Sequence, residues 1–433
     1  MTKKWSFLFL AFICLGLMTS CGDDETATSS GTSSSTSYSY VGAVTPASSK
    51  ANIFGIKAST KSDFNYGWSI TVTSAGTFSL AGGTDMEISG TYTTLDSGLL
   101  KLTVTSSSGT DAPSEGEEGY ALHIPGFVLM LSPVGGEGDL VPMLYSGTCP
   151  TENFNINYMM ASRGASGNMS ECAESASDSN DFGTNVIGVG AFDVSSGSFT
   201  QTSRYDVCNN DVSCSNIAIE ANCNGACEWD SDTSSCELMP LTYSCSNGLA
   251  AIASGSDIMA MMYLTENGGA IVATNPDTTD GTTVIGFPGD EISDASNLNG
   301  EYVGITYLPG GTSQETTFPI NVTIATESST TTMTIIKVNP DTGEDTGEIE
   351  NAVITISNVD SNATGFFRGS LAFDGEVRSY INCSVDLDVV STGKNLINCL
   401  VQKPCSSEIT GPAGTACSSG ETQENGNFII VTK

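Results

Sequence analysis

Apolar and polar residues alternate over short stretches along most of the chain, and Gly, Asn, Asp and Ser separate these stretches. In the N-terminal half the alternation is clearest at residues 68–72, 78–80, 88–92 and 100–104, where apolar side chains share one face. Each stretch predicts a half-buried strand. Their spacing of about ten residues predicts an antiparallel meander that closes into a barrel or a sandwich. Because helical periodicity is weak after the N-terminal segment, we predict a mainly β fold.

Two hairpins are marked by their turns. In Ser370 to Tyr380, Asp374-Gly375 lies between two alternating arms and suits a type I′ turn, which needs positive φ at both central positions. A second hairpin is predicted for Met259 to Thr274, with its turn near Asn267-Gly268.

A short internal repeat suggests where one domain ends and another begins. Tyr40-Val41-Gly42 opens the first β region, and Tyr302-Val303-Gly304 opens another after the loop Phe287 to Asn299. We therefore predict two antiparallel β-domains, residues 39–290 and 297–433. The first carries a cysteine-rich insert at 208–245, and the second carries disulfides near the C-terminus.

The N-terminus has the features of an export signal. Two basic residues precede an apolar run, which is followed by small residues and a cysteine: Lys3 and Lys4, Trp5 to Met18, and Thr19, Ser20 and Cys21. The apolar run is shorter than the roughly 20 residues that a membrane-spanning helix needs. The segment resembles the lipobox of bacterial lipoproteins, although Met18 and Thr19 differ from its commonest residues.

This resemblance implies cleavage after residue 20 and a lipid on Cys21 that anchors the chain to a membrane. Gly22 after the cysteine implies sorting to the outer membrane or cell surface. Residues 21–38 are rich in Ser and Thr and cannot bury enough apolar surface to fold, so we interpret them as a flexible tether. The alternative is ordinary secretion, with Cys21 free to pair with another cysteine.

Charge limits the classes of partner. The chain has 14 basic and 49 acidic residues. Removal of residues 1–20 takes away two lysines and no acidic residue. The remaining chain has 12 basic and 49 acidic residues and a net charge of −37. Such a charge repels phosphates, so we exclude nucleic acid as a partner and expect contact with the membrane only through the N-terminal lipid. Protein and glycan partners both remain open.

Cysteine usage predicts an oxidising compartment. Of the 14 cysteines, Cys14 lies in the leader and Cys21 takes lipid, which leaves an even number, 12, for six disulfides. They fall into three groups: Cys149 with Cys172; Cys208, Cys214, Cys223, Cys227, Cys236 and Cys245; and Cys383, Cys399, Cys405 and Cys417. We expect the middle group to pair only within itself, because short loops close at the lowest entropic cost. That segment resembles the small plexin-type or EGF-like modules of extracellular proteins.

Candidate chemistry is sparse. The chain has one histidine, His123, in the apolar stretch Tyr120 to Pro125, and we interpret it as structural rather than catalytic. Motifs of serine hydrolases, zinc proteases and phosphate loops are absent from the sequence. Paired carboxylates stay possible because acids are abundant. Several methionines could suggest a soft-metal site, but we assign them to the core: Met159, Met160, Met259, Met261 and Met262.

One acidic loop could bind Ca²⁺. It places carboxylates and glycines close together and does not follow the EF-hand pattern, the candidate ligands being Asp341, Glu344, Asp345 and Glu348. We interpret this segment, and the weaker one at Asn275 to Gly281, as solvated loops. We therefore expect no cofactor, with Ca²⁺ left open as an alternative.

The leading hypothesis is a lipid-anchored, non-catalytic β-protein of the cell envelope that acts as a surface, adhesive or ligand-binding module. A second hypothesis is a lipocalin-like carrier, with an apolar ligand inside a barrel formed by Asn299 to Val390; an open interior would support it. The third is an envelope hydrolase that uses paired carboxylates.

Overall fold

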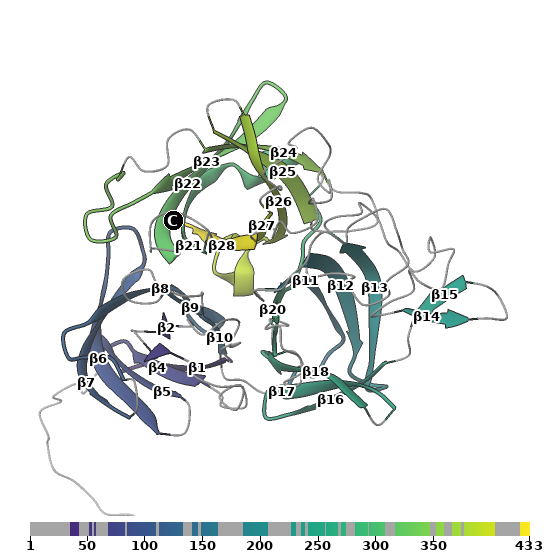
Figure 1. Ribbon diagram of the computed structural model, residues 1–433, viewed down its shortest axis with the longest axis horizontal. Coiled ribbons are helices and arrows are strands. Elements are labelled where there is room, and N and C mark those ends of the chain that lie inside the picture. Colours follow the sequence, from purple (N-terminus) through teal and green to yellow (C-terminus); the bar gives the residue numbers. More distant parts are fainter. Residues whose placement is uncertain are drawn as a thin grey trace, which may run out of the picture. The chain divides into compact units, whose positions relative to one another are not determined.

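The computed structural model describes residues 35–42, 52–53, 56–57, 68–82, 85–109, 112–132, 141–145, 149–162, 185–206, 227–230, 235–238, 241–255, 257–266, 270–273, 282–292, 294–307, 317–346, 352–358, 366–373, 376–402 and 425–433. Its main sheets are antiparallel and form three closed barrels of eight strands each (Figure 1). The prediction of a mainly β chain with antiparallel barrel or sandwich domains is confirmed. Two barrels lie within residues 37–287 and the third within residues 300–432, where the sequence predicted one β-domain in residues 39–290 and one in residues 297–433.

The first barrel, barrel 1, closes because its first strand pairs with both its second and its last. Its strands are β1 (Ser37–Gly42), β4 (Trp68–Thr73), β5 (Thr77–Gly82), β6 (Met86–Thr94), β7 (Leu100–Ser108), β8 (Glu118–Ile124), β9 (Val128–Ser132) and β10 (Val141–Tyr145). Two further short strands, β2 (Asn52–Ile53) and β3 (Ile56–Lys57), pair with each other. The stretches predicted from apolar alternation coincide with β4, β5, β6 and β7.

Barrel 2 follows the same plan, with β11 paired to both β12 and β20. Its strands are β11 (Phe154–Ser162), β12 (Asn185–Asp193), β13 (Ser198–Asp206), β16 (Leu241–Ser246), β17 (Leu249–Ser254), β18 (Asp257–Leu264), β19 (Ala270–Ala273) and β20 (Thr282–Phe287). The cysteine-rich segment contributes a separate hairpin, β14 (Cys227–Asp230) and β15 (Ser235–Leu238). Strands β18 and β19 form the hairpin predicted for Met259 to Thr274.

Barrel 3 begins after a short 3-10 helix, η6 (Ala295–Leu298). Its strands are β21 (Gly300–Tyr307), β22 (Thr317–Glu327), β23 (Thr330–Lys337), β24 (Ala352–Asn358), β25 (Phe366–Phe373), β26 (Glu376–Asp386), β27 (Leu396–Gln402) and β28 (Asn425–Thr432), and a second 3-10 helix, η7 (Val389–Ser391), follows β26. The predicted hairpin at Ser370 to Tyr380 is formed by β25 and β26; its two turn residues lie outside the described residues.

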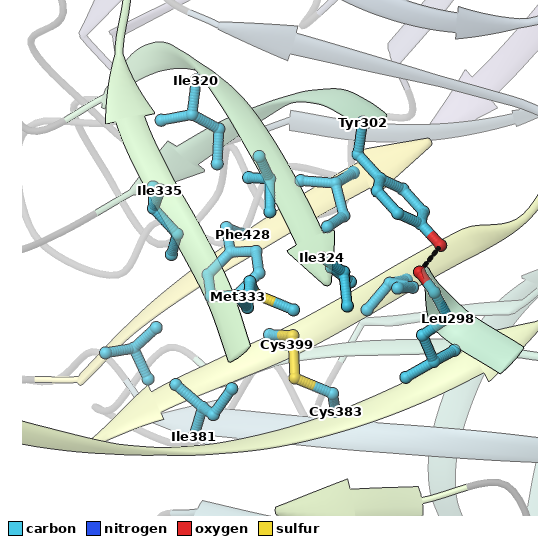
Figure 2. Close-up of a cluster of buried hydrophobic side chains, with 14 of the residues drawn as sticks. Leu298, Tyr302, Ile320, Ile324, Met333, Ile335, Ile381, Cys383, Cys399 and Phe428 are labelled. Atoms are coloured by element: carbon cyan, nitrogen blue, oxygen red, sulfur yellow. Dashed lines mark hydrogen bonds between the residues drawn. A yellow bond between two sulfur atoms is a disulfide. The ribbon is translucent and has the colours of Figure 1, made fainter. Parts of the chain in front are cut away.

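The interior of barrel 3 is filled by its own side chains. Figure 2 shows Ile320, Ile324, Met333 and Phe428 packed beside the disulfide that joins Cys383 to Cys399. Leu298 of η6 joins this cluster, and its carbonyl accepts a hydrogen bond of 2.7 Å from the Tyr302 hydroxyl. The carrier hypothesis needed an open interior here, and this packing gives it no support.

The three barrels share a further apolar cluster. Barrel 1 contributes the outer faces of β8, β9 and β10, barrel 2 contributes residues of β20, and barrel 3 contributes the outer faces of β21, β27 and β28. The members of the cluster include Leu122, Phe127, Phe287, Ile305 and Leu396. Phe127 and Phe287, from barrels 1 and 2, have ring centroids 5.6 Å apart. Burial of these faces removes apolar area from water and stabilises the association of the barrels.

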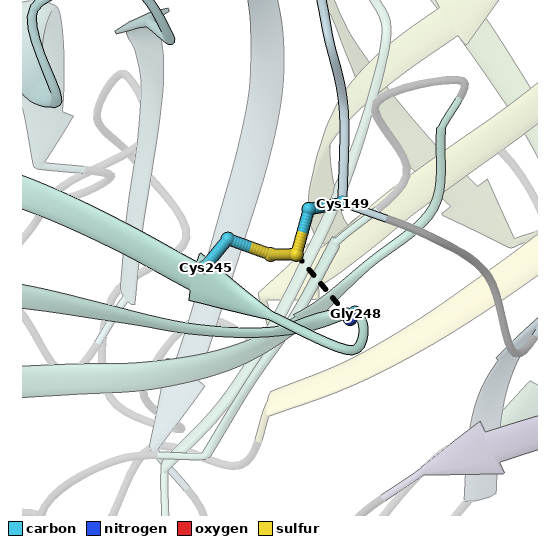
Figure 3. The surroundings of a disulfide bond; sticks show 3 residues. All are labelled: Cys149, Cys245 and Gly248. Carbon is cyan, nitrogen blue, oxygen red and sulfur yellow. Dashed lines mark hydrogen bonds between the residues drawn. A yellow bond between two sulfur atoms is a disulfide. The ribbon is translucent and has the colours of Figure 1, made fainter. Parts of the chain in front are cut away.

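One disulfide corrects the predicted pairing of the cysteines. Cys245, on β16, is bonded to Cys149, which lies between barrels 1 and 2, and the backbone N–H of Gly248 donates to Cys149 Sγ at 3.3 Å (Figure 3). The prediction that the group from Cys208 to Cys245 pairs only within itself, and the grouping of Cys149 with Cys172, were therefore wrong. Sequence distance was a poor guide because the antiparallel hairpin β16–β17 brings Cys245 beside a segment 96 residues away.

The repeated Tyr-Val-Gly has a structural basis. Tyr40 and Tyr302 are both fully buried, in the first strands of barrels 1 and 3. A Cβ on Gly42 would lie 2.5 Å from the carbonyl oxygen of Pro142, and a Cβ on Gly304 would collide with the carbonyl of Ile429. Each glycine thus allows the last strand of its barrel to approach the first closely.

Within the described part of the chain, no helix is long and apolar enough to span a membrane. Cys21 and the tether to residue 34 lie outside the described residues, as do Cys172 and Glu348.

Candidate functional site

Barrel 1 presents an outer surface dominated by Ser and Thr, which we call the hydroxyl face. It arises because β1, β4, β5, β6 and β7 alternate over most of their length. Apolar residues such as Ile70, Phe78 and Leu102 are buried inside, and small polar residues point outward. The strand register aligns the outward residues in two rows: Ser37, Thr73, Thr77, Thr91 and Thr103, and then Ser39, Thr71, Ser79 and Ser89.

Hydroxyl groups on this face interact across strands. Ser39 Oγ lies 3.0 Å from Thr71 Oγ1, and Thr73 Oγ1 lies 2.8 Å from Thr77 Oγ1. Because each hydroxyl can both donate and accept, such pairs keep further capacity for a bound partner. The five strands carry only two charged side chains, Glu87 and Lys101. In a chain with a net charge of −35, the hydroxyl face is therefore close to neutral.

Inside the same barrel, His123 belongs to an aromatic cluster. Its Nε2 lies 2.6 Å from the Tyr40 hydroxyl, and its ring packs edge-on against Tyr38 and Tyr40. The backbone N–H of Gly126 donates to the Tyr40 oxygen at 3.2 Å, so the hydroxyl proton is free to point at His123. We infer that His123 is the neutral tautomer with its proton on Nδ1.

Burial favours the same protonation state. Desolvation lowers the pKa of His123 to about 4, and burial raises the pKa of Tyr40 far above its ordinary value. The structure thus gives His123 a partner, Tyr40, that could not be identified from the sequence.

The acidic loop after β23 is held by its own backbone and by an ion pair. Asn339 Oδ1 accepts from the N–H groups of Asp341 and Thr342, which closes the turn. The Lys101 ammonium lies 2.8 Å from a carboxylate oxygen of Glu118 and 2.8 Å from one of Asp341. Both hydrogen bonds raise the pKa of Lys101, and the bond to Asp341 has the larger effect.

These contacts bear on the Ca²⁺ candidates. One oxygen of Asp341 already binds a lysine, and Asp345 forms a β-bridge with Val338 on the backbone. Across the described ranges, no group of three or more His, Cys, Asp or Glu residues could hold a metal ion.

Two methionines singled out in the sequence have described side chains. Met159 and Met262 are both buried, and Met262 lies in the apolar cluster of barrel 2. They pack as core residues, as the sequence suggested.

Three carboxylates approach one another where barrel 2 leads into barrel 3. Asp290 precedes η6, while Asp386 and Asp388 lie at the end of β26 and in the turn after it. Asp386 is buried, and the Asp290 carboxylate accepts a hydrogen bond from the Leu387 N–H. Asp386 is the buried member of this group, whereas Asp290 is half-buried and Asp388 is exposed.

Comparison with known proteins adds little. No protein-family model matches the chain, and no curated protein matches it. Among solved structures, a mutant of the vaccine antigen transferrin binding protein B from Haemophilus parasuis matches 91% of this chain and 76% of that chain, with 7% identity and a TM-score of 0.23. A likeness this slight supports no inference about this chain.

Proposed function

We propose that this chain is a lipid-anchored, non-catalytic protein of the cell envelope, and that the hydroxyl face of barrel 1 is an adhesive surface for a neutral glycan. The observation that carries the proposal is the two rows of outward Ser and Thr across five strands. The N-terminal export features, Cys21 and the Ser/Thr-rich tether support membrane attachment, and Gly22 supports the outer membrane or cell surface as its location.

A glycan fits this face better than a protein does. Protein interfaces draw most of their affinity from Trp, Tyr and Arg anchors, and the outward positions of the two hydroxyl rows offer none. Among the described residues the one exposed large hydrophobic side chain is Leu249, which lies in barrel 2. Rows of hydroxyls about 4.8 Å apart, the strand spacing, offer repeated donors and acceptors to a hydroxyl-rich polymer.

Lipid anchoring would make weak individual contacts effective. A hydrogen bond that replaces water contributes only about 1 kcal/mol, so one face alone binds a glycan weakly. Many molecules anchored on one membrane bind a long polymer together, and the effective concentration of the second and later contacts is high. The tether that the sequence predicts after Cys21 would let barrel 1 turn its hydroxyl face toward the polymer.

The anchor is tested with Cys21→Ser. We expect the wild type to enter the detergent phase in a phase-partition assay and the variant to remain in the aqueous phase with an unchanged circular dichroism spectrum. Equal partition of the two proteins would overturn the lipid anchor.

The adhesive surface is tested with a matched pair of double variants. Thr77→Glu with Thr91→Glu places two charges at facing positions of the hydroxyl face, and Thr323→Glu with Thr334→Glu does the same on β22 and β23 of barrel 3. On a panel of immobilised neutral polysaccharides, we expect the first variant to be retained at least about fivefold less than the wild type. The second should be retained like the wild type. Equal loss in both, or no retention of the wild type on any polysaccharide, would overturn the glycan proposal.

A further inference from the structure

The segment that leads from barrel 2 into barrel 3 is held to β26 by one residue. The backbone N–H of Asp290 donates to the Val385 carbonyl at 2.9 Å, and the Asp290 carboxylate accepts from the Leu387 N–H at 2.6 Å. These two hydrogen bonds lie on either side of Asp386. We call this pair of bonds the Asp290 clamp.

The clamp positions the segment that covers one end of barrel 3. Ile292 and Ala295, just after Asp290, pack against the interior cluster of the barrel together with Leu387, and Leu298 is part of that cluster. Loss of the clamp would therefore release the link between barrels 2 and 3 and loosen the cover of the interior.

Asp386 faces only negative charge. It is 8% exposed, and the two charges that act on it are those of Asp290 and Asp388. Strands β20 and β27, which neighbour β26, carry no ionisable side chain apart from the disulfide-bonded Cys399. On β25 the charged residue is Arg368, opposite Asn382 and thus four residues from Asp386 in the register. The nearby Lys394 ammonium donates to the Thr432 carbonyl at 2.8 Å.

We propose that the Asp290 clamp is a proton-controlled latch, closed when Asp386 is protonated and weakened when Asp386 ionises. An ionised Asp386, itself buried, would repel the half-buried Asp290 carboxylate that accepts from Leu387. Protonation removes that repulsion and leaves both clamp bonds in place.

The expected titration range lies near neutrality. Desolvation, followed by the charges of Asp290 and Asp388, raises the pKa of Asp386 to about 7. A carboxyl whose pKa is raised in the folded state binds more protons there than in the unfolded chain, so its contribution to stability falls as pH rises toward 7. The latch would thus respond to changes of pH close to neutrality.

Amide hydrogen exchange measured by mass spectrometry tests the latch on the full chain. After correction for the intrinsic exchange rate, we expect protection of a peptide containing Leu387 to fall about tenfold between about pH 5.5 and about pH 8.5. Asp386→Asn cannot ionise and should keep the same protection across this range. Glu301→Gln, an exposed change on β21, serves as the control and should behave like the wild type.

Two further variants keep the test decisive if Asp386→Asn fails to fold. Asp290→Asn retains a side-chain oxygen that can accept from the Leu387 N–H. Asp388→Asn retains an acceptor for the Gly393 N–H, and residue 388 has a left-handed backbone conformation that Asn tolerates. Each removes one negative neighbour and should shift the midpoint of the protection change to lower pH. No pH dependence in the wild type, an unchanged dependence in Asp386→Asn, or an unmoved midpoint in both neighbour variants would overturn the latch.

Discussion

The hydroxyl of Tyr40 on β1 lies 2.6 Å from Nε2 of His123 on β8, inside barrel 1. Tyr40 is fully buried and accepts from the Gly126 N–H, which leaves its hydroxyl proton to donate to a neutral imidazole. Protonation of His123 would place two donors against the Tyr40 oxygen and leave the hydroxyl proton without a partner. The pair therefore makes barrel 1 sensitive to acid.

We expect the stability of barrel 1 to fall as pH drops from about 6.5 to about 4. The pKa of His123 is lowered to about 4 in the fold, so the unfolded chain binds the proton first and acid favours unfolding. The loss should be about 1 to 3 kcal/mol, since one pKa unit corresponds to about 1.4 kcal/mol and His123 is only half-buried. His123→Gln keeps an acceptor for Tyr40 and should lose this pH dependence.

The measurement is urea unfolding followed by tryptophan fluorescence in a Trp229→Phe background. Trp68, buried in barrel 1, is then the only tryptophan after residue 20. An identical pH dependence in the wild type and His123→Gln would show that another group controls the acid response.

The Cys149–Cys245 bridge should stabilise the connection between barrels 1 and 2. It closes a loop with a sequence separation of 96, for which restriction of the unfolded chain gives about 4.7 kcal/mol. We expect Cys149→Ser with Cys245→Ser to lower the midpoint of urea unfolding while the described sheets persist. Peptide mapping without reductant should recover the bridge, and recovery of Cys245 bonded to any other cysteine would contradict the structure.

The strands were predictable because closed antiparallel sheets bury one face, which leaves a period-two pattern in residues such as Ile70, Val72 and Phe78. The sequence did not show that barrel 2 is separate from barrel 1, because the first strand of barrel 2, β11, lacks the Tyr-Val-Gly sequence. In barrel 2 the close approach of β11 and β20 depends instead on Gly286. The hydroxyl face was visible only as Ser/Thr-rich strands. The alignment of these residues into rows depends on the register between strands. The partners of His123 and Asp341 also depend on contacts between distant segments, and such contacts leave no local sequence signal.

The loop around Asp341 should bind Ca²⁺ weakly, at best with a dissociation constant of about 10⁻⁴ to 10⁻³ M. Lys101 occupies one Asp341 oxygen, so binding of Ca²⁺ there would have to displace an ammonium. Calorimetric titration of the wild type and of Lys101→Met checks this, with the variant expected to bind Ca²⁺ no more weakly than the wild type. Micromolar affinity in the wild type would show that the loop is a genuine metal site.

Two glycines on β21 should respond in opposite ways to the same substitution. Gly304→Ala places a Cβ against the Ile429 carbonyl on β28, which is backbone and cannot move aside without opening the seam that closes barrel 3. We expect a loss of about 1 to 3 kcal/mol or more, typical of overpacking. At Gly300 the nearest atom would be Tyr302 Cε2 at 3.5 Å, an ordinary contact, so Gly300→Ala should be neutral or slightly stabilising because it restricts the unfolded chain. Urea unfolding of both variants checks the contrast, and equal effects at the two positions would mean that the close approach of β28 to Gly304 does not limit the side chain there.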